Sequence, residues 1–503
     1  MATTDFAFCE ATDLADRIRT KQVSPVEVMR ATLDRIDAIS PSLNCFITVC
    51  GEAALDAARA AEQTIMDGAA IGPLHGVPFA VKDMVQTANV ATTYGCLPLR
   101  DNVPKFDELP IRRLKNAGGI LVGKTTTPEF AHACKTESPL FGRTINPWNH
   151  RLTAGGSSGG SSVALAAGLV PLAVGTDSGG SSRIPAACNA VVGLKQTLGL
   201  IPDDAALDVF NSLISTNPMG RSSRDVALML SVMSGPDTSD PFSLTRAAAS
   251  VADELWTGDL RGLRIARMPA RPGYVLDTEV ASAFEESLRI FAAAGAEIIS
   301  PAAMELYQDP EAWEAEPGAW IVIQGSLRRL RYGDTIDRFE QFLSRSFMDG
   351  VRGADGFTRQ EYQRALIVRA RLFAEVQRWF GEYDLVVMPT TTRTAISIEQ
   401  NIPDSISING KLVGNVHRQW FPDTHAFNMT GHPALAVPCG WSAAGDPISI
   451  QIVAGWGADL AALKAGHALS LSVENRVPTF DPVDADVISA RDSALVMVDS
   501  ELA

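Results

Sequence analysis

The sequence predicts an α/β fold, in which a central sheet is covered by helices, and two observations support this class. Short apolar segments typical of buried strands alternate with helical patterns along much of the chain. The 503 residues are 46% hydrophobic and 20% charged, which is typical of a chain that buries a large core. We expect a single large domain with a central twisted mixed β-sheet, helices on both faces and a helix-rich insertion.

The N-terminal part is predicted to form two helices and then a strand. Residues 24–27 combine a helix N-cap serine, a first-turn proline and a capping-box glutamate. The alanine-rich segment 52–66 predicts a second helix. The short apolar run 77–81 predicts a buried strand, so Lys82 and Asp83 are expected at its end.

The rest of the chain continues the alternation. We expect helices at 111–117, 162–167, 224–234 and 277–293, and strands at 119–122, 172–174, 385–388, 434–437 and 448–453. The late strands are most economically added to the same sheet. Residues 301–382 are charged, helix-rich and poor in strand patterns. We therefore expect one domain over residues 1–503, with a catalytic core at about 70–235 and a helix-rich insertion at about 300–382.

Composition and charge argue against several classes of protein. The formal charge of −15 repels nucleic acid and anionic membrane surfaces. The N-terminus lacks the basic stretch and apolar core of a signal peptide. The apolar runs are shorter than the about 20 residues that cross a bilayer. Seven cysteines without a CxxC pair favour reduced thiols. We expect a cytoplasmic protein that binds neither nucleic acid nor membranes.

Two tracts rich in glycine and serine, 155–162 and 175–183, carry most of the functional information. Flexible linkers have this composition, but these tracts flank the apolar segment 163–174, which is typical of a core. Glycines in loops next to a core let backbone N–H groups converge on one point. The tracts therefore predict a site for an anion or oxyanion, as used in phosphate binding and in acyl transfer.

Residues 118–125 match the nucleotide-binding pattern G-x4-G-K-[ST]. The surrounding sequence contradicts that interpretation, because the β-forming triplet 120–122 lies inside the supposed loop and Thr-Thr-Thr-Pro follows where a helix should begin. We interpret the segment as a strand and its exit turn. Nucleotide binding through residues 118–125 remains the alternative outside the hydrolases.

Acyl transfer requires a nucleophile, a base and an oxyanion hole, so the base decides between mechanisms. No histidine falls into a Ser-His-Asp pattern, and His75 and His432 are interpreted as structural. A lysine can replace histidine where burial lowers its pKa, and Lys82 is suitably placed for this role. The alternative is an exposed lysine paired with Asp83. No histidine or cysteine spacing indicates a metal site, and none is expected.

Several short motifs, taken together and in order, resemble the amidase signature family of serine hydrolases. They extend over most of the chain, at residues 76–83, 123–125, 128–130, 146–148, both Gly/Ser tracts, 185–187, 192–195, 383–384, 388–390, 428–434 and 451–453. The resemblance implies a Ser–cis-Ser–Lys triad at Ser181, Ser157 and Lys82. It further implies that Ser181 attacks the acyl carbon, and that Ser157, next to a cis peptide, relays the proton to neutral Lys82.

The resemblance also assigns supporting positions. The backbone N–H groups that match the oxyanion hole are those of Ser178, Gly179, Gly180 and Ser181. Residues with expected supporting roles are Ser158, Asp177 and Arg183, the last two as polar braces of the loop. The segment 131–137 is where substrate contacts are expected, with Ala131 and Cys134 as candidates. No cofactor is implied.

The expected function is hydrolysis of a small, uncharged or aromatic amide, such as an anilide, through an acyl-enzyme. A carbamate or an ester fits the same site, because the tetrahedral intermediate is similar. A subunit of a glutamine amidotransferase, which works with partner subunits, is a further alternative. The sequence leaves open whether the chain forms a homodimer.

Overall fold

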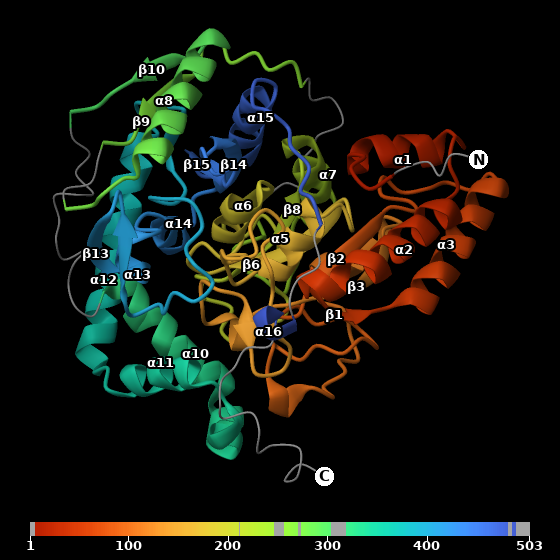
Figure 1. The fold of residues 1–503 in the computed structure, drawn as a ribbon, viewed down its shortest axis with the longest axis horizontal. Coiled ribbons are helices and arrows are strands. Elements are labelled where there is room, and N and C mark those ends of the chain that lie inside the picture. The colour runs from red at the N-terminus through yellow and green to blue at the C-terminus, as the bar shows by residue number, and fades with distance from the viewer. Residues whose placement is uncertain are drawn as a thin grey trace.

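The structure, a computed structural model, describes residues 6–210, 212–245, 256–269, 273–302, 318–480 and 485–488. Its centre is an 11-stranded mixed sheet (Figure 1). The strands of this sheet are β1 (Phe46–Val49), β2 (Pro78–Lys82), β3 (Ile120–Thr125), β6 (Leu172–Asp177), β7 (Val192–Lys195), β8 (Ser215–Gly220), β9 (Arg264–Arg267), β10 (Glu297–Ile299), β11 (Leu385–Pro389), β14 (Ala434–Trp441) and β15 (Pro447–Ala454). Two separate pairs are β4 (Glu137–Ser138) with β5 (Gly142–Arg143) and β12 (Ser405–Ile408) with β13 (Lys411–Asn415).

Helices surround this sheet. They are α1 (Ala11–Arg19), α2 (Pro25–Leu43), α3 (Gly51–Met66), α4 (Leu109–Asn116), α5 (Gly159–Ala166), α6 (Arg183–Asn189), α7 (Ser223–Met233), α8 (Thr278–Ala293), α10 (Ala319–Phe339), α11 (Arg345–Asp355), α12 (Arg359–Trp379), α13 (Val416–Gln419), α14 (Thr424–Thr430), α15 (Asp459–Ser470) and α16 (Ala485–Ile488). Short 3₁₀ turns are η1 (Leu97–Leu99), η2 (Glu129–Ala131) and η4 (Glu340–Phe342). None of the helices described has the length and apolarity to cross a bilayer.

The spatial order of the strands is β1-β3-β2-β6-β8-β7-β14-β15-β11-β9-β10. β3, β2 and β6 are parallel neighbours, as are β11, β9 and β10, and antiparallel pairs connect these two groups through β8, β7, β14 and β15. Strands from both halves of the chain thus share one sheet. The α/β class, the mixed sheet and the addition of the late strands to it are confirmed.

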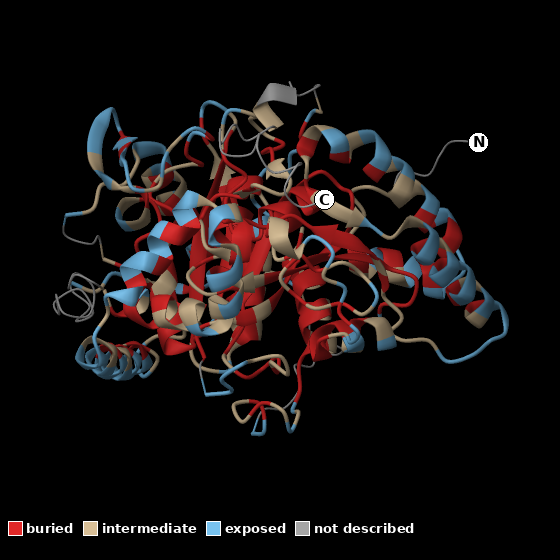
Figure 2. Cartoon of the chain, turned by 90° about the horizontal axis from the view of Figure 1, so that it is seen from below, coloured by how far each residue is buried: buried red, intermediate tan, exposed pale blue. Residues whose placement is uncertain are grey.

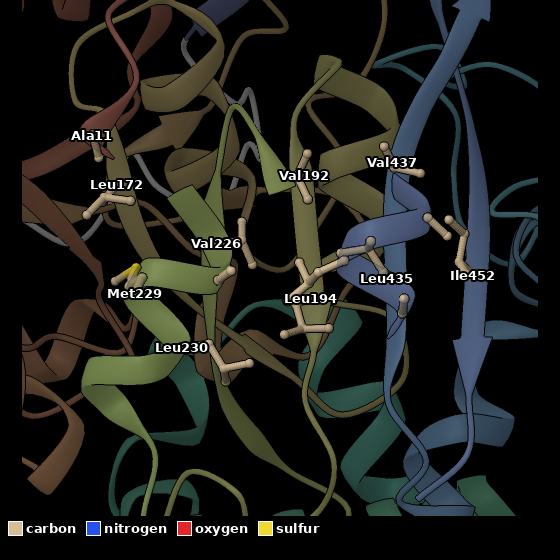
Figure 3. Packing of buried hydrophobic residues seen from close by; sticks show 14 of the residues in the cluster. Ala11, Leu172, Val192, Leu194, Val226, Met229, Leu230, Leu435, Val437 and Ile452 are labelled. Atoms are coloured by element: carbon tan, nitrogen blue, oxygen red, sulfur yellow. The ribbon is translucent and has the colours of Figure 1, made fainter. Parts of the chain in front are cut away.

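Both faces of the sheet are buried. Along β2, Phe79 and Val81 enter one hydrophobic cluster, whereas Ala80 between them enters another on the opposite face. This alternation follows from the two-residue period of a strand. In Figure 3, Val226 and Leu230 of α7 pack beside Leu194 of the sheet. Figure 2 shows the sheet buried and the outer sides of the helices exposed, so helices cover both faces, as predicted.

The predicted helix-rich segment 301–382 is helical over most of its described part. It holds α10, α11 and α12 and adds no described strand to the sheet. Residues 303–317 lie outside the described residues. The helices of this segment pack on one another, and α10 also contacts the loop after β6, which brings the segment to the candidate site.

Candidate active site

Lys82 is the last residue of β2 and is completely buried. Its Nζ donates hydrogen bonds to Ser157 Oγ at 2.7 Å and to Thr176 Oγ1 at 2.8 Å. Burial lowers the pKa of Lys82 well below its usual value, although the negative charge of Asp177 opposes this shift. The neutral amine, which a general base requires, is therefore favoured.

The alternative of an exposed Lys82 paired with the next residue is wrong. The Asp83 carboxylate is buried and accepts the backbone N–H of Thr93 at 3.1 Å. Its nearby cation is Lys124, whose Nζ lies 4.0 Å from Asp83 Oδ1. Lys82 instead faces Ser157 of the first Gly/Ser tract.

Ser157 lies in the first Gly/Ser tract and is fully buried. The peptide bond between Gly156 and Ser157 is cis, at the position that the family resemblance implied. The tract is not a loop throughout, because α5 begins at Gly159 rather than at residue 162. At Gly160 an added Cβ would collide with the backbone nitrogen of Thr126, so only glycine permits this close packing of two chain segments.

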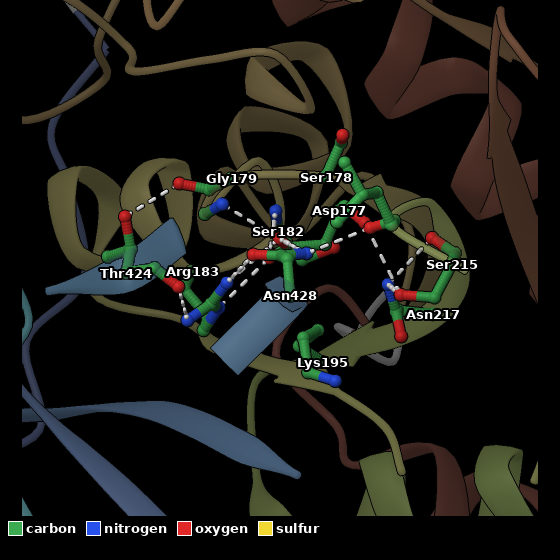
Figure 4. A network of polar contacts seen from close by, with 12 residues as sticks. Asp177, Ser178, Gly179, Ser182, Arg183, Lys195, Ser215, Asn217, Thr424 and Asn428 are labelled. Carbon is green, nitrogen blue, oxygen red and sulfur yellow. Dashed lines mark hydrogen bonds and ion pairs between the residues drawn. The ribbon is translucent and has the colours of Figure 1, made fainter. Parts of the chain in front are cut away.

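The second tract forms the end of β6, a tight loop and the start of α6. Asp177 ends β6, and its carboxylate binds Arg183 through two hydrogen bonds, Nη2–Oδ1 at 2.9 Å and Nε–Oδ2 at 3.0 Å. It also accepts the N–H groups of Gly180 at 2.7 Å and Ser182 at 3.1 Å (Figure 4). Burial raises the pKa of Asp177, but Arg183 and these hydrogen bonds outweigh it and lower the pKa to about 2.

The expected oxyanion donors differ in availability. The Gly180 N–H, which was expected to belong to the oxyanion hole, instead donates to Asp177, and this corrects the expectation for that residue. Within the part of the chain that the structure describes, the N–H groups of Ser178, Gly179 and Ser181 have no hydrogen-bond partner. Ser158 supports this loop, because its N–H donates to Ser181 O at 3.1 Å. Three donors are therefore left for a ligand.

Three further residues hold the loop, and sequence reasoning did not identify them. Trp320 Nε1 donates to Ser178 O at 2.7 Å, Ser178 Oγ donates to Gln324 Oε1 at 2.8 Å, and Thr424 Oγ1 donates to Gly179 O at 2.6 Å. Trp320 and Gln324 belong to α10, more than a hundred residues further along the chain. No local pattern in the sequence connects them to the loop.

Ser157, Ser178 and Ser181 line a common cavity of about 580 Å³, a volume usual for small-molecule sites. Ala131 also lines it, whereas Cys134 packs in a hydrophobic cluster with Ile184 and Cys188 and is not part of the lining. This position corrects the expectation that Cys134 contacts the substrate. The cavity lining within the described residues includes no histidine.

The two histidines interpreted as structural lie in structural surroundings. His75 Nε2 is 2.9 Å from the carbonyl oxygen of Ala61, and His432 Nε2 is 3.0 Å from Gln377 Oε1. Among the described residues, no group of three or more His, Cys, Asp or Glu side chains could hold a metal ion. All seven cysteines are free thiols.

The structure of residues 118–125 differs from that of a nucleotide-binding loop. Ile120–Thr125 is strand β3, as predicted. Lys124 is fully buried, and its Nζ donates to Thr92 Oγ1 at 2.7 Å instead of facing an open loop. The amine is therefore not accessible to a phosphate in the folded structure.

Comparisons with known proteins identify the family of the chain. The family model described as Amidase matches residues 27–463, so the chain belongs to the amidase family. It is 34% identical to an acylamidase of Rhodococcus erythropolis, over 88% of this chain and 91% of that protein. It is 32% identical to one of the subunits of the glutamyl-tRNA(Gln) amidotransferase of Acidothermus cellulolyticus, over 93% of this chain and 94% of that protein.

Among solved structures, a bacterial aryl acylamidase of the amidase signature enzymes superposes with a TM-score of 0.82 at 25% identity, over 92% of this chain and 96% of that one. The family, the fold and these relatives agree with one another. The chain is an amidase, a hydrolase that acts on carbon–nitrogen bonds.

Proposed function

We propose that this enzyme hydrolyses a small-molecule amide through an acyl-enzyme on Ser181, with Ser157 relaying the proton to Lys82. The observation that carries the proposal is the 2.7 Å hydrogen bond from Lys82 Nζ to Ser157 Oγ. It joins a buried amine with a lowered pKa to a serine that lines the same cavity as Ser181.

In acylation, Ser181 Oγ attacks the carbonyl carbon while its proton passes to Ser157 Oγ, and the proton of Ser157 passes to the neutral amine of Lys82. The carbonyl oxygen becomes an oxyanion, for which the unpartnered N–H groups of Ser178, Gly179 and Ser181 are the proposed donors. The C–N bond then breaks, and the amine leaves with the proton that Lys82 returns. Water hydrolyses the ester by the same proton route.

The proposed substrate is an acyl amide with an aromatic part. The names of the acylamidase and aryl acylamidase relatives support this class. The aromatic rings of Tyr94, Phe130 and Tyr332 line the cavity and offer flat apolar surface to a ring. Carbamates and esters remain candidates because they pass through a similar tetrahedral intermediate. Cytoplasmic location also remains a prediction.

Labelling with a fluorophosphonate, followed by peptide mapping, tests the nucleophile. We expect the label on Ser181, loss of labelling and turnover in Ser181→Ala, and retention of both in the neighbouring Ser182→Ala. A label on Ser157 or Ser182 would contradict the assignment.

A second candidate is the amide-hydrolysing component of a glutamine amidotransferase, favoured by 32% identity to one of the subunits of such an enzyme over 93% of this chain. Assays of the purified chain without partner subunits distinguish the two candidate functions. Turnover of anilides without a partner supports the free-standing enzyme, whereas glutamine hydrolysis that requires added partner subunits supports the second candidate.

A further inference from the structure

One wall of the cavity is a single face of α10. Gln324, Arg328, Arg331 and Tyr332 line it at spacings of four, seven and eight residues, which place side chains on one side of a helix. Gln324 accepts a hydrogen bond from Ser178 in the candidate oxyanion loop. Arg328 follows one helical turn later, so its backbone lies about 6 Å further along the wall.

Among the residues that the structure describes, Arg328 has no carboxylate partner. Among these residues its guanidinium forms no ion pair within 4 Å and donates no hydrogen bond, and burial and Tyr332 are the causes that shift its pKa. Its Cζ lies 5.9 Å from the centre of the Phe347 ring, which supports it from α11. Five N–H donors are therefore left for a ligand in the cavity.

The other charged groups in the described lining have a group of opposite charge nearby, are mostly neutral or face solvent. Burial lowers the pKa of Arg331, but the nearby charges of Tyr332 and Asp203 outweigh this effect and raise it. Asp204 pairs with Arg112 at 3.6 Å. Burial raises the pKa of Glu108 to about 8, so this side chain is mostly uncharged at neutral pH.

Asp208 is the remaining acid of the lining, and it lies in the exposed part of the loop. Its carboxylate accepts the backbone N–H of Phe210 at 3.0 Å. Within the described part of the inner wall, Arg328 is thus a positive charge that no nearby carboxylate balances.

We propose that Arg328 binds an anionic group of the substrate, a carboxylate or a group of the same charge and geometry, at the end remote from the scissile amide. The inference rests on the proposed amide hydrolysis and narrows its substrate class. It replaces the uncharged substrate expected from the sequence with an acidic one. A guanidinium suits this task because its fork of donors matches the two oxygens of a carboxylate.

The test compares kcat/KM within two substrate families. In the first, glutaryl, hexanoyl and 5-aminopentanoyl 4-nitroanilide share a leaving group and differ in the charge of the acyl chain. In the second, 4-acetamidobenzoate and 4-methylacetanilide differ in the charge of the amine part. In one of the two families, we expect kcat/KM for the anionic member to be about 10- to 100-fold higher than for its neutral partner. This is the range for a hydrogen bond to a charged group.

The variants are Arg328→Met, Arg328→Lys and the matched control Arg329→Met. Arg329 is the next residue of α10 and pairs with Asp337 outside the cavity. We expect the anionic-to-neutral ratio to collapse in Arg328→Met, to be partly kept in Arg328→Lys and to stay unchanged in Arg329→Met. Thermal unfolding checks that each variant is folded.

The outcomes separate this inference from the proposed function. Three results overturn the role of Arg328 alone, provided that the neutral anilides are hydrolysed. They are no preference for the anionic member in either family, a preference for the cationic member, and a preference for the anionic member that persists in Arg328→Met. Failure of the wild-type enzyme to hydrolyse any member of either family, together with no Ser181 label, overturns the proposed function itself.

Discussion

Arg183 and Asp177 form a fully buried ion pair with two hydrogen bonds, of 2.9 and 3.0 Å, and they bracket the candidate oxyanion loop in the sequence. Arg183 also donates to Asn428 Oδ1 at 2.7 Å and to Gln451 Oε1 at 2.5 Å. The pair thus ties the loop to α14 and β15, which lie far away in the sequence (Figure 4). Its integrity decides whether the loop keeps its shape.

Replacing Asp177 by alanine is expected to destabilise the protein by about 3–5 kcal/mol, because it leaves the Arg183 charge buried without its partner. The free energy of unfolding in urea measures this loss. Asp259→Ala, which breaks the exposed pair with Arg261, is the control and should change the unfolding midpoint little. Similar small effects of both substitutions would mean that the buried pair does not hold the fold.

The same pair predicts a dependence of stability on acid. The pKa of Asp177 in the folded protein is about 2, below the usual value of about 3.9. A depressed pKa contributes stability that is complete above the unfolded-state pKa and is lost as the pH falls through the folded-state pKa. The stability difference between wild type and Asp177→Asn should therefore be constant above about pH 5 and shrink towards pH 2. A difference that is independent of pH would contradict this.

Trp320→Phe is expected to lower kcat by about 5- to 10-fold with little change in KM, because it removes one hydrogen bond. That bond holds Ser178 O, and in a trans peptide the N–H of Gly179 points the opposite way, towards the proposed oxyanion. Trp148→Phe is a matched control, since Trp148 Nε1 donates to Asn189 O at 3.0 Å outside the cavity lining. An equal loss in the control would indicate a structural effect only.

ATP is expected to leave the melting temperature unchanged at millimolar concentration. A ligand that binds the folded state raises this temperature, but Lys124 is buried in β3 and bonded to Thr92, so it is not accessible to a phosphate. The measurement is thermal unfolding with and without ATP. A rise with ATP that disappears in Lys124→Met would restore the nucleotide-binding interpretation.

Local sequence patterns predicted the helices and strands whose own residues favour the conformation that they adopt in the fold. The capping box of residues 24–27 is confirmed, because the Ser24 side chain accepts the backbone N–H of Glu27 and the Glu27 side chain accepts the N–H of Ser24. The apolar run before Lys82 is strand β2, as expected. In contrast, β8 (Ser-Thr-Asn-Pro-Met-Gly) has no apolar alternation and only one β-branched residue, Thr216, yet it pairs with β6 and β7 inside the sheet. Tertiary contacts decide its conformation.

Some residues of the candidate site could likewise be predicted from the sequence, and others could not. Lys82, Ser157 and Ser181 belong to motifs that are recognisable in one sequence. Trp320, Gln324 and Arg328 lie on a helix of the insertion, and only the packing of α10 over the cavity brings them to the site. The competition for the Gly180 N–H is likewise invisible in the sequence, because it depends on the direction of the Asp177 carboxylate.

Substitutions of Lys82 distinguish the proposed mechanism from one in which a histidine is the base. Because burial lowers its pKa, kcat/KM should rise with pH as the amine loses its proton and should level off below the usual lysine pKa of about 10.4. Lys82→Ala is expected to lose about 100- to 10,000-fold in kcat/KM, the range for a general base. Lys82→Arg should do no better, since a guanidinium does not release its proton in this range.

The controls for Lys82 are His75→Ala and His432→Ala, which should cost far less activity and act through stability, because both histidines hydrogen-bond structural partners away from Ser157. Full pH–rate profiles of the parent and the four variants, with folding checked by thermal unfolding, provide the comparison. If Lys82→Arg kept most of the activity, Lys82 would be a structural cation and not the general base. Loss of most activity from one histidine substitution in a folded variant, together with loss of the pH dependence, would instead indicate that this histidine is the base.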